Sequence, residues 1–262
     1  MSLFYPEHEK CIPKGYGVLN LLNKSFSSKQ RKEIIVANIG CRIVTDFARP
    51  QRSLIDLFHN LPVANIDDCM NRVCAAHNNI RPMNKIPLLG PAFTIKVPEG
   101  DNLMFHKAMD MAKEGDVIVI DAGGLTTRAI FGELMISYCI ARKMAGVIVD
   151  GSIRDSAAIA EMDFPVYARG ISPNGPYKNG PGEINTPISF GGLVVTPGDI
   201  VVGDADGIVF IKPHEAEELA EKVQIVSNKE EQIKNDIIGK GSFVRPWVDE
   251  LLKGLDCEIV EA

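Results

Sequence analysis

The sequence has 262 residues, of which 45% are hydrophobic and 24% are charged, and its formal net charge is −6. This composition is ordinary for a globular protein that can bury a full core, so it excludes disordered and collagen-like classes. The acidic balance disfavours nucleic-acid binding, which needs a basic surface. Neither a membrane span nor a secretion signal is predicted, so we expect a cytoplasmic protein with no membrane partner.

The first part of the chain, residues 1–56, is mixed and polar, and we interpret it as an N-terminal extension. Within it, residues 24–32 predict the start of a basic helix. From residue 57 to 212 we expect one core domain, in which strands and helices first alternate. Helices are predicted over 62–74, 102–113, 130–144 and 155–162, and strands over 90–97, 117–121, 147–150 and 165–168. This β-α-β alternation predicts a parallel sheet layer covered by helices.

The later part of the core has a different pattern. Residues 171–187 are rich in proline and glycine and predict a long loop, a type of segment that often carries function. Short strands are predicted at 193–195, 200–202 and 208–211, joined by tight turns as antiparallel neighbours. Residues 213–262 predict a C-terminal helix over 214–235 and a tail whose role the sequence leaves open.

The most informative segment is 146–155, GVIVDGSIRD, in which an apolar strand ends and delivers Arg154 and Asp155. Ligands of α/β folds bind at the C-terminal ends of strands. Such a dipeptide at a helix start can also be a helix cap with a solvated neighbour, so the residues around it decide between the two interpretations. Twenty residues, one predicted helix and one predicted strand separate Glu133 from Arg154. That spacing returns the chain to the same edge of the sheet.

The residue types at this edge suit the binding of an anion and a metal. Gly132, Glu133, Leu134 and Met135 lie where a loop runs into its helix, so their amides and the helix dipole can hold a carboxylate. The Arg154 guanidinium can bind a carboxylate or enolate through two parallel hydrogen bonds. The Asp155 carboxylate is a hard oxygen ligand suited to Mg²⁺ or Mn²⁺, and Glu133 can order water or move a proton.

Other polar residues receive simpler interpretations. Lys96 is the only lysine on an apolar strand, and it is the weaker, competing candidate for a Schiff-base mechanism. We interpret His106 as a packed or surface histidine, with the alternative that one face of its helix approaches the site, and Lys178 as a solvated side chain. Arg128 stays open as a second anion contact. Gly123 and the glycine after it lack the further residues of a dinucleotide-binding motif.

The ordered series of motifs resembles the 4-hydroxy-4-methyl-2-oxoglutarate aldolase family, which is related to the regulator of ribonuclease E activity A and is often labelled demethylmenaquinone methyltransferase. The resemblance covers about residues 57–211 and the helix after them. The segments that carry it are 115–121, 132–135, 150–155, 164–170 and 197–199, with the Glu-x20-Arg-Asp spacing. It implies an α/β fold of the swivelling β/β/α type, with a central mixed sheet flanked by helices, assembled as a homotrimer or homohexamer.

The resemblance also implies an activity, namely a divalent-metal-dependent retro-aldol cleavage of a 4-hydroxy-2-oxo di- or tricarboxylate. The reaction releases pyruvate, and oxaloacetate decarboxylation can accompany it. Arg154 would bind the pyruvyl carboxylate and stabilise the enolate, the amides of 132–135 would hold the carboxylate, and Asp155 would ligate Mg²⁺ or Mn²⁺. Glu133 stands where the family commonly has aspartate. Glu230 and Glu231 lie where a neighbouring subunit can contribute an acid.

Two other functions remain as alternatives. The first is a non-catalytic, protein-binding regulator of a ribonuclease, as in the related part of the same superfamily. The presence of Glu133, Arg154 and Asp155 together argues against it. The second is a methyltransferase, which needs a strand, a glycine-rich turn and a helix to bind S-adenosylmethionine, and residues 115–124 do not supply that unit.

Overall fold

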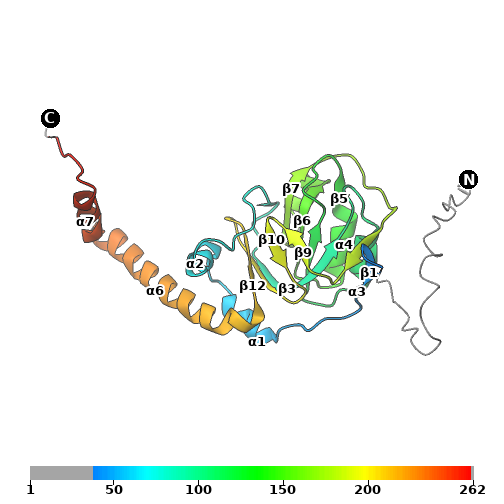
Figure 1. The fold of residues 1–262 in the computed structure, drawn as a ribbon, viewed down its shortest axis with the longest axis horizontal. Coiled ribbons are helices and arrows are strands. Elements are labelled where there is room, and N and C mark those ends of the chain that lie inside the picture. Colours follow the sequence, from blue (N-terminus) through cyan, green and yellow to red (C-terminus); the bar gives the residue numbers. More distant parts are fainter. Residues whose placement is uncertain (1–37, 261–262) are drawn as a thin grey trace, which may run out of the picture. The chain divides into compact units, whose positions relative to one another are not determined.

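A computed structural model describes residues 38–260. The chain divides after Asn38, and residues from Ile39 onward form one compact unit built around a mixed β-sheet (Figure 1). The helix start predicted over 24–32 lies outside the described residues.

The centre of the sheet is a parallel layer, as predicted from the β-α-β alternation. Its strands are β3 (Leu88–Lys96), β4 (Val117–Asp121), β6 (Gly146–Ile153) and β7 (Val166–Ile171), in that spatial order. Every residue of β4 and β6 is buried, because this layer is covered on both faces. The C-terminal ends of the four strands therefore meet at one edge, where the candidate site lies.

Shorter strands extend this layer and make the sheet mixed. They are β1 (Cys41–Ile43), β2 (Arg81–Pro82), β5 (Ala129–Phe131), β8 (Gly182–Ile184), β11 (Ile200–Gly203) and β12 (Ile208–Ile211). Strand β3 pairs antiparallel with β11 and β8, β11 also pairs with β12, and β1 lies parallel to β8. Strands β9 (Ile188–Phe190) and β10 (Leu193–Val195) form a separate hairpin. The predicted α/β fold with a central mixed sheet is confirmed.

Helices cover one face of the sheet. The helical elements are α1 (Arg52–Ile55), the 3₁₀ turn η1 (Asp56–Phe58), α2 (Val63–Cys69), α3 (Leu103–Met111), α4 (Glu133–Ala141), α5 (Ser156–Ala160), the 3₁₀ turn η2 (Pro213–Glu215), α6 (Ala216–Lys240) and α7 (Pro246–Gly254). Phe105 of α3 and Ile136 of α4 pack in one core cluster with the strand residues Ile118 and Val147. On the opposite face, a second cluster joins the parallel layer to β9–β12. The start of α6 packs with α2 and η1 in a third.

Four predicted elements are wrong in detail. Residues 130–144 are not one helix, because 129–131 pair with the end of β6 as a strand and α4 starts only after Gly132. The helix predicted over 62–74 ends at Cys69, since Asn71 and Arg72 adopt left-handed backbone conformations. The predicted loop 171–187 contains β8. The strands joined by the turn at 197–199 do not pair with each other, because β10 pairs with β9.

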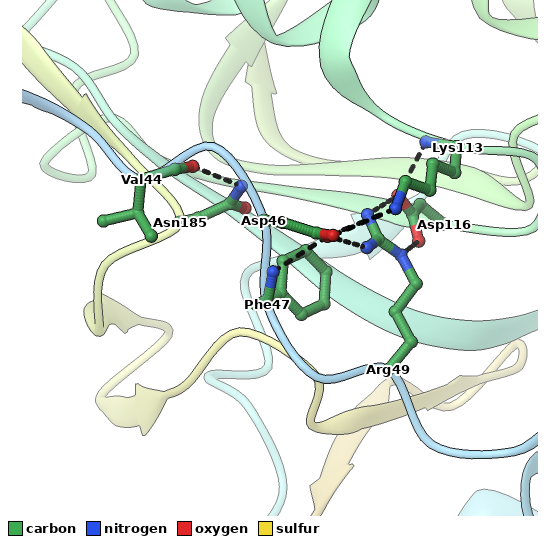
Figure 2. Close-up of polar contacts among 7 residues, drawn as sticks. All are labelled: Val44, Asp46, Phe47, Arg49, Lys113, Asp116 and Asn185. Atoms are coloured by element: carbon green, nitrogen blue, oxygen red, sulfur yellow. Dashed lines mark hydrogen bonds and ion pairs between the residues drawn. The ribbon is translucent and has the colours of Figure 1, made fainter.

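Residues that were assigned to the N-terminal extension contact the core. Strand β1 joins the sheet edge, and Arg49 forms a two-point ion pair with Asp116. Figure 2 shows this cluster, in which Arg49 also donates to Asp46. The boundaries at residues 56 and 212 stay predictions.

Among the described residues, no helix has the length and apolar composition needed to cross a bilayer.

Candidate active site

The site forms where the ends of β5 and β6 lie side by side. The Arg154 amide donates to the Phe131 carbonyl at 3.0 Å, so the chain leaving β6 runs directly beside the start of α4. The next strand joins the same edge, since the Ser172 amide donates to the Ile153 carbonyl at 2.9 Å. Two chain segments that are distant in sequence thereby place Gly132 beside Arg154 and Asp155, and a third segment, at Ser172, borders them.

Asp155 caps a helix other than its own. It occupies the N-cap position of α5 in a left-handed conformation, with φ of 57°, and makes no side-chain bond to that helix. Instead its Oδ2 accepts the Glu133 amide of α4 at 3.1 Å. Aspartate tolerates this conformation better than most residues, and its charge is favourable at a helix N-terminus. The helix-cap interpretation of the dipeptide is thus partly correct, although the capped helix is α4.

Gly132 is required at the start of α4 because of space. Its backbone is extended, so no left-handed conformation demands glycine here. A Cβ at this position would overlap Asp155 Oδ2 and lie 2.9 Å from Arg154 Cγ. Any larger residue would push the Arg154–Asp155 segment away from α4.

The four amides predicted to hold a carboxylate are partly occupied within the chain. The Glu133 amide donates to Asp155, and the Met135 amide donates to the Gly132 carbonyl at 3.2 Å. The helix N-terminus is therefore already neutralised in part by the Asp155 carboxylate. A bound anion would have to share this end of α4 with Asp155.

Arg154 and Asp155 form only a loose ion pair. Arg154 Nε lies 3.6 Å from Asp155 Oδ2, and the two side chains are 47% and 43% exposed. An arginine that binds a carboxylate well makes two parallel hydrogen bonds at shorter distances. The Arg154 guanidinium is therefore accessible to a ligand.

A cavity of about 380 Å³ collects the predicted site residues. Its lining includes all six of them: Gly132, Glu133, Leu134, Met135, Arg154 and Asp155. Cavities of this size hold small ligands. The structure thus brings these residues into one concave site.

The cavity also contains residues that were not among the six predicted site residues. His106 reaches it from α3, Asn102 reaches it from the N-cap position of that helix, and Lys178 reaches it from the loop between β7 and β8. Partial burial, and then the nearby Lys178 charge, lower the pKa of His106 from its usual value. The spacing of four residues between Asn102 and His106 was the sequence signal for a shared helix face.

The remaining candidates do not line this cavity. Arg128 donates to the Gly175 carbonyl and to the Tyr177 hydroxyl, both at 2.8 Å, and so supports the neighbouring loop. Lys96 is exposed at the end of β3. Glu230 accepts a 2.7 Å hydrogen bond from Asn65 within its own chain.

The donor set suits a loosely held divalent cation. Across residues 38–260, no three His, Cys, Asp or Glu side chains are grouped as a metal cage. Mg²⁺ commonly takes only one or two carboxylates and fills its other positions with water and substrate. The exposed Asp155 carboxylate, with Glu133 in the same cavity, fits that pattern.

Comparison with known proteins identifies the family. A family profile described as RraA-like, Aldolase/RraA, matches residues 63–210. The chain belongs to this family. It is 37% identical over 199 residues to a Halalkalibacterium halodurans protein named "Putative 4-hydroxy-4-methyl-2-oxoglutarate aldolase", and the match covers 76% of this chain and 95% of that one.

Solved structures of the same fold carry different names. A Geobacillus kaustophilus protein titled S-adenosylmethionine:2-dimethylmenaquinone methyltransferase is 31% identical, with a TM-score of 0.54 over 57% of this chain and 94% of that one. Streptomyces coelicolor RraAS2, titled an unusual member of the RNase ES inhibitor RraA family, is 23% identical, with a TM-score of 0.63 over 71% and 98%. The second match shows the fold alone.

Proposed function

We propose that this protein is a divalent-metal-dependent aldolase that cleaves a 4-hydroxy-2-oxo di- or tricarboxylate to pyruvate and a second oxo acid. The observation that carries the proposal is the loose, exposed Arg154–Asp155 pair beside the N-terminus of α4, within a cavity of ligand size. The relatives named as aldolases support it.

The residues that line the cavity have different roles in substrate binding and cleavage. The Arg154 guanidinium binds the carboxylate and the 2-oxo oxygen of the pyruvyl part of the substrate, where negative charge grows as the carbon–carbon bond breaks. Lys178 and His106 lie in the same cavity and contact the rest of the substrate. Glu133 accepts the proton of the 4-hydroxyl group, directly or through water, as the bond between C3 and C4 breaks, and the same proton returns to C3 of the enolate to give pyruvate.

Asp155 is the residue that would hold Mg²⁺ or Mn²⁺, and Glu133 would order the water around the ion. Such an ion would supply Lewis-acid stabilisation of the negative charge that develops on the 2-oxo oxygen. Lys96 is not needed, since charge stabilisation by arginine and metal replaces imine formation. The same site also fits oxaloacetate decarboxylation, because that reaction passes through the same pyruvate enolate.

Two alternatives fit the structure less well. A methyltransferase requires a strand followed by a glycine-rich turn and a helix, but the turn after β4 at Gly123 leads into strand β5. A regulator that only binds protein has no need of a cavity holding Arg154, Asp155 and Glu133 together. The regulator remains the alternative function.

The decisive experiment is a panel of 2-oxo acids incubated with the protein and Mg²⁺, with pyruvate release followed through lactate dehydrogenase. We expect release from at least one 4-hydroxy-2-oxo acid and from oxaloacetate. Borohydride added with pyruvate should leave every lysine unmodified by mass spectrometry. No pyruvate from any member of the panel would reject the aldolase proposal and leave the regulator.

We also propose a homotrimer or homohexamer in the cytoplasm, with an acid such as Glu230 or Glu231 contributed near a subunit boundary. Light scattering at micromolar concentration tests the assembly. A monomeric mass would refute it.

A further inference from the structure

One wall of the cavity is a loop, residues 174–181 between β7 and β8, which carries Lys178. Loops of this proline- and glycine-rich type need external contacts to hold a single conformation. The backbone provides some of them. The Tyr177 amide donates to the Gly100 carbonyl at 2.8 Å, and the Asn102 amide donates to the Tyr177 carbonyl at 3.0 Å.

Asp101 supplies the strongest of these contacts. Its side chain is only 3% exposed. Oδ2 accepts the amides of Asn179 and Gly180 at 2.6 and 3.0 Å, while Oδ1 accepts the Leu103 amide at 2.9 Å. One buried carboxylate thus connects the residues just after Lys178 to the first turn of α3.

The two ends of this connection both reach the cavity. Helix α3 presents His106 to it, and the loop presents Lys178. Hydrogen bonds to a charged acceptor are stronger than those between neutral groups. The Asp101 carboxylate therefore fixes the position of Lys178 relative to His106 and the rest of the cavity.

Arg128 holds the same loop from its other side. It bonds the Gly175 carbonyl and the Tyr177 hydroxyl, and its guanidinium lies 4.1 Å from the centre of the Tyr177 ring. Gly100 leaves the room for this side chain, because a Cβ there would lie 2.8 Å from Arg128 Cδ. Asp101 and Arg128 both hold the loop, and neither of them lines the cavity.

We infer that Asp101 is a positioning residue of this site, which keeps the 174–181 loop and its Lys178 in the ligand-binding arrangement before a ligand arrives. The inference rests on the proposed function for its kinetic consequences. A loop released from Asp101 would have to be ordered during binding, which weakens affinity. The chemical step at Arg154 would change much less.

The test compares Asp101→Asn with a matched control, Asp199→Asn. Asp199 is also buried, at 2% exposure, and its Oδ2 also accepts a turn amide, from Thr196. It differs in that it also pairs with Lys212 Nζ at 2.6 Å, and it lies outside the cavity lining. In Asp101→Asn, the new side chain keeps one acceptor oxygen and places an NH₂ group against an amide donor. Hydrogen exchange by mass spectrometry should show roughly tenfold faster exchange over 174–181 in Asp101→Asn alone.

Ligand binding provides the second measurement. In Asp101→Asn we expect the KM for the cleaved 2-oxo acid to rise by roughly tenfold, with kcat within about threefold of wild type. Calorimetric affinity for oxalate with Mg²⁺, a stable analogue of the pyruvate enolate, should fall in parallel. The control should change neither quantity.

Several outcomes would overturn the inference. They are unchanged exchange over 174–181, faster exchange with unchanged oxalate affinity, or an equal loss of affinity in the control. If the wild type releases no pyruvate, the aldolase proposal fails. Hydrogen exchange over 174–181 and the affinity for oxalate still test the role of Asp101 in that case. If Asp101→Asn does not fold, Arg128→Met releases the other side of the same loop and must give the same pattern.

Discussion

Two Arg–Asp pairs in this protein differ in almost every physical respect. Arg49 meets Asp116 through two bonds of 2.7 Å, and the Asp116 side chain is fully buried (Figure 2). Arg154 and Asp155 are 3.6 Å apart and both nearly half exposed.

The surroundings of the two pairs explain the difference. Asp116 also accepts the Lys113 amide at 2.8 Å, and Arg49 also contacts Asp46 and lies 4.0 Å from the centre of the Phe47 ring. Hydrogen bonding to Asp116 raises the pKa of Arg49 above its usual value. This pair is complete within the chain. Arg154, in contrast, has bonding capacity left over, so the comparison distinguishes a structural pair from one that awaits a ligand.

Removal of divalent metal should have the largest effect on activity, and it should affect the Arg154–Asp155 pair but not the Arg49–Asp116 pair. Chelation with EDTA is expected to reduce pyruvate release to background, and Mg²⁺ or Mn²⁺ should restore it, because the enolate charge needs a Lewis acid. The melting temperature should change little, since the Arg49–Asp116 pair contains no metal. Full activity in excess chelator would contradict the proposed mechanism.

The sequence predicts the exposed Arg154–Asp155 pair but not the buried Arg49–Asp116 pair. Arg154 and Asp155 stand together after an apolar strand, so their strand-end position follows from local pattern. Arg49 and Asp116 are 67 residues apart, and no local pattern links them. Continuous apolar runs such as 117–121 also predict the parallel strands correctly. Strand β8 was missed because its pairing with β3 and β1, and not its proline-rich neighbourhood, determines its conformation.

The same contrast explains which site residues the sequence missed. Lys178 lies in a loop whose path depends on Asp101 and Arg128, both distant in sequence. The role of Asp155 as a cap of α4 depends on the close approach at Gly132, which only the tertiary structure defines.

Substitution of Asp116 should have the next largest effect, which is a loss of folding stability. Asp116→Ala leaves the Arg49 charge and the Lys113 amide without their partner, and breaking such a pair typically costs about 3–5 kcal/mol. Urea unfolding measures this free energy. The double variant Arg49→Met/Asp116→Ala should lose less than the two single losses added together, because the two residues interact. Activity per folded molecule should persist. A selective loss of kcat would show that the Arg49–Asp116 pair contributes to catalysis.

Arg154→Ala should reverse this pattern. Loss of one charge-stabilising contact typically lowers the rate about 10²–10³-fold, or about 2.7–4 kcal/mol. The free energy of unfolding should stay near that of wild type, because the Arg154 side chain is exposed and bonded only loosely. Arg154→Lys should restore little activity, since an ammonium cannot make the two parallel bonds of a guanidinium. A variant that melts much lower but turns over normally would make Arg154 a structural residue.

The smallest expected effect is a pKa change at His106, which reports whether the cavity takes an anion. In the free protein, partial burial and the Lys178 charge hold the His106 pKa below its usual value. The unfolded chain then binds more protons than the folded one around that pKa, so this group makes stability rise with pH and loses that contribution as pH falls. A bound anion such as oxalate favours the protonated imidazole, so it should raise the pKa. Histidine ring resonances followed by NMR against pH, and assigned with His106→Gln, measure the shift. Arg154→Ala should abolish it, because oxalate no longer binds. A shift of equal size in that variant would place the anion elsewhere and would separate His106 from the Arg154–Asp155 site.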